Sequence, residues 1–320
     1  MRRFHVDLPD GVMTGISYGD VNSPVEILYL HANGFNAGTY QSILQPLSVA
    51  AHVAALDMRG HGRTTLPAEP GRFRSWHRHR DDVIAAIRKI APDGLVLAGH
   101  SMGATVALLV AAKEPDLVRG LVLTEPVLLS PRWIRLAHLP VVGAFLTAQN
   151  RMVRIARKRQ RTFASPEDAE SRLSGKGAFA TWRTPFLADY LMDGLESGKD
   201  GQYQLSCKPE WEAACFAAQR NRPWTAIFKL RKKPAIPIII QQADRNSTTL
   251  SDTDYRVHMF RPDAAISRIP GTTHFLPMER PYVVRDAISL IYSAWRGQLV
   301  DDGVGAVRRT PHDAPVEGTD

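Results

Sequence analysis

Residues 95–113 have the sequence LVLAGHSMGATVALLVAAK. A short apolar run ends at a glycine and a second apolar run follows at residues 104–112, so the pattern predicts a buried strand, a sharp turn and a helix. Gly99 and Gly103 flank Ser101 in the turn, where larger side chains would crowd a strained backbone. A G-x-S-x-G turn between a strand and a helix presents its serine as a nucleophile, so Ser101 is the first candidate functional residue.

The same alternation of strands and helices continues on both sides of this segment. Short apolar runs bounded by turn residues are typical of buried parallel strands, and intervening helices favour right-handed crossovers. The expected strands lie at 25–30, 52–56, 95–98, 120–124, 236–241 and 265–269, and the expected helices at 75–90, 101–113, 251–260 and 281–296. Pro9-Asp10-Gly11 predicts an antiparallel hairpin at one edge. The chain is therefore expected to be an α/β protein with a mostly parallel sheet.

The alternation stops between residues 126 and 233. This segment holds 19 of the 40 Lys and Arg residues, only 9 of the 32 Asp and Glu residues, and 12 of the 25 aromatic residues. Because so many aromatic side chains need apolar surface to pack against, we expect a helical lid at 126–233, inserted into a core made of residues 1–125 and 234–297. Residues 298–320 show neither periodicity nor an apolar face, so we expect a disordered tail there.

One part of this insertion is strongly basic. The cations Arg151, Arg154, Lys158 and Arg161 recur at helical spacing, with Met152, Ile155 and Ala156 on the opposite side. The pattern predicts an amphipathic basic helix, for which we favour a solvated face over the attraction of an acidic substrate or an anionic surface. Because the basic excess lies in this single insertion and no nucleic-acid-binding motif accompanies it, we expect no nucleic-acid partner.

Composition and motifs exclude several other classes of protein. With 44% hydrophobic and 22% charged residues the chain can form a core, and no run approaches the ~18 apolar residues of a membrane span. The N-terminus lacks the apolar region of a secretory signal, so we expect a cytoplasmic protein without integral membrane association. Cys207 and Cys215 form no C-x-x-C pair and no nucleotide- or metal-binding motif is present, so neither cofactor nor metal is expected. The oligomeric state stays open.

Four motifs together resemble those of the α/β-hydrolase superfamily, and the resemblance covers residues 4–297. The motifs are HANGF at 31–35, DMRGHG at 57–62, GHSMG at 99–103, and GTTHF at 271–275 followed by Glu279-Arg280-Pro281. The resemblance implies an eight-stranded, mostly parallel sheet with helices on both faces. It also implies a helical lid inserted after strand six, which is where the alternation stops here.

A serine hydroxyl needs a base within hydrogen-bonding reach before it attacks. His274 is the candidate, because it follows the last expected strand and comes after the serine in the chain, as it does in the resembling superfamily. Most relatives place their acid after strand seven, where this chain has Asn246, and a carboxamide cannot stabilise an imidazolium. Asp244 in the same loop and Glu125 at the end of strand six are both candidates for the acid, and we favour Glu125 slightly.

The transition state of acyl transfer also needs two donors for a developing oxyanion. The backbone N–H of Met102, directly after the serine, is expected to be the first. The resemblance implies that Asn33 in the HANGF loop is the second, with Phe35 in reserve. Asp57, Arg59 and His61 of the DMRGHG motif are expected to brace the sheet edge.

These residues predict a cofactor-independent serine hydrolase that cleaves an ester, thioester or similar acyl bond of a small, largely apolar substrate. C–C bond hydrolases and cofactor-free haloperoxidases of the superfamily use the same residues, so they stay as alternatives. Dehalogenases and epoxide hydrolases are disfavoured, because they use a carboxylate where this chain has Ser101. The asparagine at position 246 also keeps open a non-catalytic, ligand-binding protein.

Overall fold

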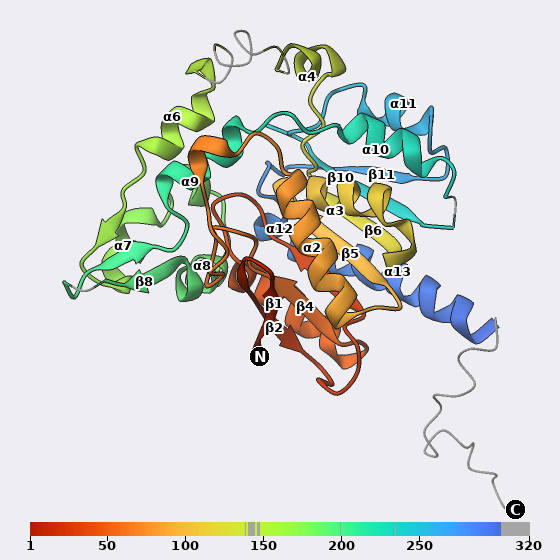
Figure 1. Cartoon of the computed structure of the whole chain (residues 1–320), viewed down its shortest axis with the longest axis horizontal. Coiled ribbons are helices and arrows are strands. Elements are labelled where there is room, and N and C mark those ends of the chain that lie inside the picture. Colours follow the sequence, from red (N-terminus) through yellow and green to blue (C-terminus); the bar gives the residue numbers. More distant parts are fainter. Residues whose placement is uncertain (138, 140–144, 146–147, 199, 234, 302–320) are drawn as a thin grey trace, which may run out of the picture.

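The computed structural model describes residues 1–137, 139, 145, 148–198, 200–233 and 235–301. At its centre lies an eight-stranded sheet with the strand order β1-β2-β4-β3-β5-β6-β10-β11 (Figure 1). The pairs β1–β2 and β2–β4 are antiparallel, and every other neighbouring pair is parallel. The strands are β1 (Arg2–Leu8), β2 (Gly11–Tyr18), β3 (Ile27–Leu30), β4 (Val53–Leu56), β5 (Leu95–His100), β6 (Val118–Thr124), β10 (Ile238–Ala243) and β11 (Ala265–Ile269). This topology confirms the predicted α/β class, its mostly parallel sheet and its edge hairpin.

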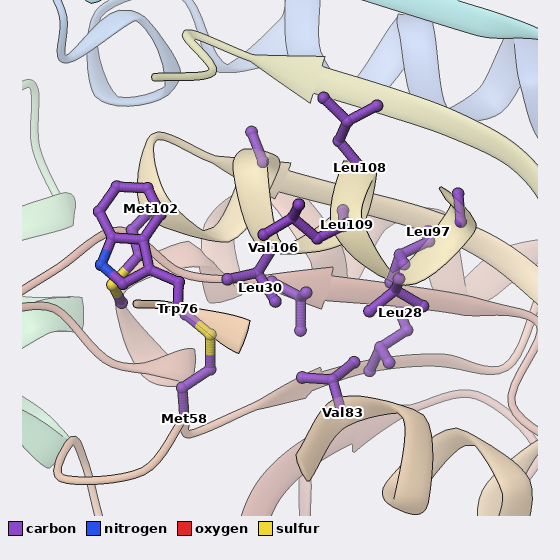
Figure 2. Close-up of a cluster of buried hydrophobic side chains, with 14 of the residues drawn as sticks. Leu28, Leu30, Met58, Trp76, Val83, Leu97, Met102, Val106, Leu108 and Leu109 are labelled. Atoms are coloured by element: carbon purple, nitrogen blue, oxygen red, sulfur yellow. The ribbon is translucent and has the colours of Figure 1, made fainter. Parts of the chain in front are cut away.

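Helices cover both faces of the sheet, because alternate residues of a buried strand point to opposite sides. In β3, Leu28 and Leu30 belong to one apolar cluster, whereas Ile27 and Tyr29 belong to the other. Figure 2 shows the first cluster, in which the β3 leucines face Val106. The helices of the first face are α2 (His77–Ile90), α3 (Met102–Lys113) and α10 (Pro223–Leu230), and those of the second are α1 (Gln41–Leu44), α12 (Leu276–Glu279) and α13 (Pro281–Asp301).

The segment between β6 and β10 contains a small sheet as well as helices. Its helices include α4 (Pro131–Ala137), α6 (Arg151–Arg157), α7 (Pro166–Leu173), α8 (Phe186–Gly194) and α9 (Pro209–Ala217), and α11 (Thr253–His258) follows β10. The antiparallel sheet has the order β7-β9-β8, with β7 (Thr162–Phe163), β8 (Leu195–Ser197) and β9 (Tyr203–Leu205). The sequence predicts a helical segment here and does not predict this sheet. Strands of two or three residues are too short to show the alternation of apolar and polar residues by which a strand is recognised. Short 3₁₀ helices occur at Ala37–Tyr40, Gln45–Val49, Pro70–Arg72, Pro115–Leu117 and Gly177–Phe179.

Two buried aspartates fix α8 to the central sheet domain. Asp189 accepts hydrogen bonds from Gln41 Nε2 at 2.6 Å and from Ser42 Oγ at 2.5 Å. Asp193 accepts both terminal nitrogens of Arg3, at 2.9 and 2.6 Å, and Nε of Arg63 at 2.9 Å. A carboxylate without such partners would be too costly to bury, so these bonds hold α8 in one position against the sheet domain.

Two segments differ from the boundaries expected. α10 lies within residues 126–233, but it packs on α3, and its Ala226 and Ile227 belong to the cluster of the core strands. α13 continues to Asp301, so residues 298–301 of the expected tail are helical, because a single glycine at position 297 costs a helix only about 1 kcal/mol. Residues 302–320 of that tail lie outside the described residues. Within the described ranges, no helix combines the length and the apolar character needed to cross a membrane.

Candidate active site

Ser101 lies in a strained turn between β5 and α3, with φ 55° and ψ −115°. A residue with a side chain adopts such angles only when its surroundings hold it there. A Cβ on Gly99 would lie 2.6 Å from the carbonyl carbon of Gly103, and a Cβ on Gly103 would collide with the carbonyl oxygen of Leu30. The Ser101 N–H donates to the carbonyl oxygen of Thr124 at 3.0 Å. The two glycines and β6 therefore fix the serine at the carboxyl end of the central strands.

The imidazole of His274 bridges this serine and a buried carboxylate. Its Nε2 lies 2.9 Å from Ser101 Oγ, and its Nδ1 lies 3.0 Å from Glu125 Oε2. The Glu125 side chain is fully buried and that of His274 is 21% exposed. With Nδ1–H donating to the carboxylate, Nε2 is free to accept the proton of the serine hydroxyl, so the three side chains can generate an alkoxide nucleophile.

Glu125 is held by donors from the last residue of β10 and from the loop that follows it. Its Oε1 accepts the Ala243 N–H at 2.5 Å and the Ser247 hydroxyl at 2.7 Å, and its Oε2 accepts the Thr248 N–H at 3.0 Å. Burial by itself raises the pKa of this carboxyl group, but the hydrogen bond and charge of His274, together with these donors, hold the pKa below its usual value. The side chain therefore stays a carboxylate beside the imidazole.

The other candidate acid lies elsewhere. The Asp244 side chain is exposed, and its Oδ2 accepts the Gly271 N–H at 3.3 Å. Asn246, in the position where most relatives have their aspartate, is also exposed and has φ 53°. Of the two acids considered from sequence, the structure brings Glu125 to His274 and leaves Asp244 at the surface.

Two backbone N–H groups on the loops after β3 and β5, those of Asn33 and Met102, have no hydrogen-bond acceptor within the described part of the chain. Met102 begins α3, and the first N–H groups of a helix have no acceptor within it. In the HANGF loop, the N–H groups of Gly34 and Phe35 donate to protein acceptors at 3.1 and 3.2 Å. The side-chain amide of Asn33 donates to a backbone carbonyl of α9 at 2.9 Å. The main-chain N–H of Asn33 is therefore the donor that this loop leaves open, and Phe35 is already engaged.

The DMRGHG loop makes structural contacts. Asp57 accepts the N–H groups of Ala37 at 2.8 Å and of Arg63 at 3.1 Å. Burial raises the pKa of its carboxyl group to about 6, although these two hydrogen bonds lower it. The Arg59 guanidinium forms two hydrogen bonds of 2.8 Å with Asp82 of α2. His61 accepts the N–H of Gly34 on the HANGF loop. These contacts tie β4 to its neighbours, as expected for a brace.

A buried chain of hydrogen bonds links the serine turn to the loop of His274. The N–H of Ala32 donates to Tyr40 Oη at 3.1 Å, Tyr40 Oη lies 2.8 Å from His100 Nδ1, and His100 Nε2 lies 2.7 Å from the carbonyl oxygen of His274. Because a carbonyl only accepts, His100 Nε2 carries the proton and Nδ1 accepts from the tyrosine hydroxyl. Burial, and secondarily the charge of His274, hold the pKa of His100 well below its usual value. The neutral ring therefore joins three loops of the site.

We predict that Tyr40→Phe lowers the free energy of unfolding by about 2–4 kcal/mol, because it leaves the buried Ala32 N–H and His100 Nδ1 without partners. Tyr29→Phe is the matched control. Tyr29 is equally buried and stacks on Tyr40 at 4.6 Å, but among the described residues its hydroxyl has no partner. Its removal should cost nothing or stabilise the fold. Urea unfolding of both variants measures the difference, and equal losses would contradict the bonding pattern.

A cluster of aromatic side chains lies beside His274. Phe275 follows it directly, and Phe35 and Trp182 stack near Phe275 at ring-centroid distances of 6.3 and 6.1 Å. Phe35 also meets Trp182 edge-on at 5.0 Å. Phe35 comes from the HANGF loop and Trp182 from the insertion, so core and insertion both contribute to this cluster.

Several residues of the site carry no signal that the sequence analysis used. Thr248 is one of them. Its hydroxyl donates to the carbonyl oxygen of Glu125 at 2.8 Å and lies 3.5 Å from His274 Nδ1, but it stands in a loop without a recognisable motif. The three consecutive hydroxyl residues at 247–249 are the one sequence feature that could have indicated donors for a buried carboxylate. Arg159 pairs with Glu212 at 2.8 Å beside Gly34 of the HANGF loop, and nothing in the sequence distinguishes it from the other cations of the basic segment.

A mostly parallel sheet with a strained serine turn after its fifth strand, a histidine after its last strand and an acid after its sixth defines the class of α/β-fold hydrolases. The model of the Alpha/beta hydrolase family matches residues 27–287, and the chain belongs to that family. This assignment confirms the superfamily resemblance seen in the four motifs.

Curated relatives and solved structures carry different activities. The chain is 24% identical over 267 residues to the 2-(acetamidomethylene)succinate hydrolase of Mesorhizobium japonicum, covering 82% of this chain and 86% of that protein. It is 22% identical to the sn-1-specific diacylglycerol lipase of Mus musculus, covering 85% and 81% of the two chains. The thioesterase domain from the curacin biosynthetic pathway superposes with a TM-score of 0.73 at 17% identity, covering 90% of this chain and 99% of that one. At these identities the shared fold is established, whereas the substrate differs from relative to relative.

Proposed function

We propose that the protein is a serine hydrolase that cleaves an ester, thioester or similar acyl bond of a small, largely apolar substrate. Ser101 is the nucleophile, His274 the general base and Glu125 the orienting acid, and the N–H groups of Met102 and Asn33 are the oxyanion donors. The observation that carries the proposal is the placement of His274 within 3.0 Å of both Ser101 and Glu125.

The geometry supports a two-step acyl transfer. His274 Nε2 takes the proton of Ser101 as its oxygen bonds to the acyl carbon, and the two backbone donors receive the charge on the acyl oxygen. The imidazolium, held by Glu125, then protonates the leaving alcohol or thiol. Water deprotonated by the same imidazole attacks the acyl-enzyme, releases the acid and returns the proton to Ser101. No step of this scheme draws on a cofactor.

The aromatic cluster beside His274 favours an acyl group with little charge. Phe35, Trp182 and Phe275 offer no charged partner to a substrate, and the nearby Arg159 is neutralised by Glu212. Two relatives support acyl bonds of this kind, since one is named as a lipase and the other as a thioesterase. No contact among the described residues favours the alternatives on the same triad, C–C cleavage and peroxidation.

The test pairs a fluorophosphonate probe with p-nitrophenyl esters from acetate to laurate. We expect the probe to label Ser101 covalently. We also expect turnover of the esters, with the fastest rate at the acyl chain length that best fits the substrate-binding site. Because the probe reacts only with an activated serine, labelling distinguishes a hydrolase from a ligand-binding protein of the same fold. Absence of both labelling and turnover in folded protein would overturn the proposal.

A further inference from the structure

The proposed chemistry leaves the basic part of the insertion without a role. Residues 126–166 contain eight Lys and Arg residues and no Asp or Glu. Arg159 and Arg161 pair with Glu212 and Glu210 of α9. The other six cations are exposed, and no ion pair between described residues involves them. They are Arg132 and Arg135 of α4, and Arg151, Arg154, Arg157 and Lys158 at α6.

Large apolar side chains are exposed among these cations. Leu136 and Leu139 are 43% and 50% exposed, and Phe145 is 62% exposed. On α6, Met152 and Ile155 are 44% and 49% exposed. We call these five side chains and the six unpaired cations the α4–α6 surface. Exposed apolar side chains that occur in one segment together with charge of one sign are typical of a binding surface rather than a merely solvated one.

The orientation of α6 follows from its packing. Val153 and Ala156 are buried against α9, where they form a small cluster with Ala213. At 100° per residue the opposite side of the helix carries Arg151, Arg154, Ile155 and Lys158, with Met152 beside Ile155. Figure 1 shows α4 and α6 at the same end of the molecule, at the top of the view, away from the β1–β2 hairpin. The helix therefore turns both its cations and its exposed apolar side chains outward. The prediction that Met152 and Ile155 lie opposite the cations is wrong, because α9 covers only the side of Val153 and Ala156.

We propose that the α4–α6 surface binds the anionic surface of a lipid bilayer, with the cations at the headgroups and Met152 and Ile155 inserted at the acyl boundary. Residues 126–166 contain Lys and Arg but no Asp or Glu, so the partner that complements their charge is anionic. A nucleic acid would use the cations but would leave the exposed apolar side chains in water, so the combination favours lipid. This binding does not depend on the proposed hydrolysis.

Co-sedimentation with vesicles tests the proposal. We expect wild-type protein to bind vesicles of phosphatidylcholine with phosphatidylglycerol at low salt, and to bind phosphatidylcholine alone or in high salt far more weakly. The triple change Arg151→Gln, Arg154→Gln and Lys158→Gln should weaken binding about 100-fold, at about fivefold for each charge. The matched control, Lys229→Gln, Arg231→Gln and Lys232→Gln at the end of α10, removes the same charge and should keep most of the affinity.

A second pair of variants tests the apolar contribution. Met152→Gln with Ile155→Gln should weaken vesicle binding roughly tenfold, whereas Met259→Gln with Leu290→Gln, two side chains 56% and 64% exposed elsewhere, should leave it unchanged. Turnover of a soluble p-nitrophenyl ester should stay within a few-fold in every variant, which separates failure of this proposal from failure of the proposed function. Failure of wild-type protein to bind anionic vesicles, equal losses in the two triple variants, or binding of RNA instead would overturn the proposal.

Discussion

Replacing Ser101 by alanine should lower the turnover of a p-nitrophenyl ester by about a million-fold, the cost typical of losing the nucleophile of a triad. The change removes one oxygen atom and leaves His274 without the hydroxyl that lies 2.9 Å from its Nε2. Alanine keeps the Cβ of serine, so the strain at φ 55° is the same before and after the change. The free energy of unfolding should therefore stay within about 1 kcal/mol of the wild type, and lost activity can be assigned to chemistry.

The measurement is steady-state turnover with parallel urea unfolding. Ser48→Ala is the control, because its hydroxyl donates to the carbonyl oxygen of Gln45 at 2.7 Å on the surface and should leave turnover unchanged. A Ser101→Ala protein that keeps a tenth of the wild-type rate would rule out Ser101 as the nucleophile. A folded variant that no longer reacts with the fluorophosphonate probe would complete the assignment.

The sequence predicts the serine turn well because most of its determinants are local. The apolar runs before and after the turn dictate a buried strand and a buried helix, and Gly99 is required by its contact with Gly103, whereas Gly103 is required by the carbonyl oxygen of Leu30 on β3. The strand nevertheless extends past the predicted residue 98 to His100, since Gly99 and His100 still pair with β6. Backbone pairing of this kind depends on the neighbouring strand and leaves no mark on the strand's own periodicity.

Contacts between residues far apart in the sequence could not be predicted from the sequence pattern. Tyr40 and His100 are separated by 60 positions and meet only once the sheet has formed. The HANGF motif predicts Asn33 as an oxyanion donor, but it does not predict that the Asn33 side chain contacts the backbone of α9, 179 positions away. The three short strands of the insertion are also defined by their partners, because two or three residues carry no periodicity of their own.

The choice of acid shows the same limit. Glu125 and Asp244 both follow strands that end at the same edge of the sheet, so chain order alone cannot separate them. The structure separates them through backbone angles and donors. Glu125 has φ 52°, and its carboxylate lies where the end of β10 supplies Ala243 and the following loop supplies Ser247 and Thr248. No propensity scale predicts a glutamate with positive φ, because such angles persist only where the surroundings impose them.

Changing Glu125 to glutamine should lower turnover by about 10⁴-fold, the cost of removing the orienting carboxylate from a serine triad. Both oxygens of Glu125 accept hydrogen bonds from donors, so the amide nitrogen of glutamine meets a donor in either orientation. If it faces His274, Nδ1 must become the acceptor, and the proton moves to Nε2, which then cannot take the proton of Ser101. The amide also lies against the Thr248 N–H in this orientation and against the Ala243 N–H in the other, so the fold loses stability in both and urea unfolding must accompany the kinetics.

Asp244→Asn is the matched control for this change, because it replaces a carboxylate by an amide in the neighbouring loop. Asparagine keeps an oxygen that can accept the Gly271 N–H now bound to Asp244 at 3.3 Å, and the exposed side chain makes no contact with His274. Turnover should therefore stay within a few-fold of the wild type, since at most one surface hydrogen bond of about 1 kcal/mol is altered. A crippled Asp244→Asn protein beside an active Glu125→Gln protein would reverse the assignment, because Asp244 would then have to reach Nδ1 in the working enzyme.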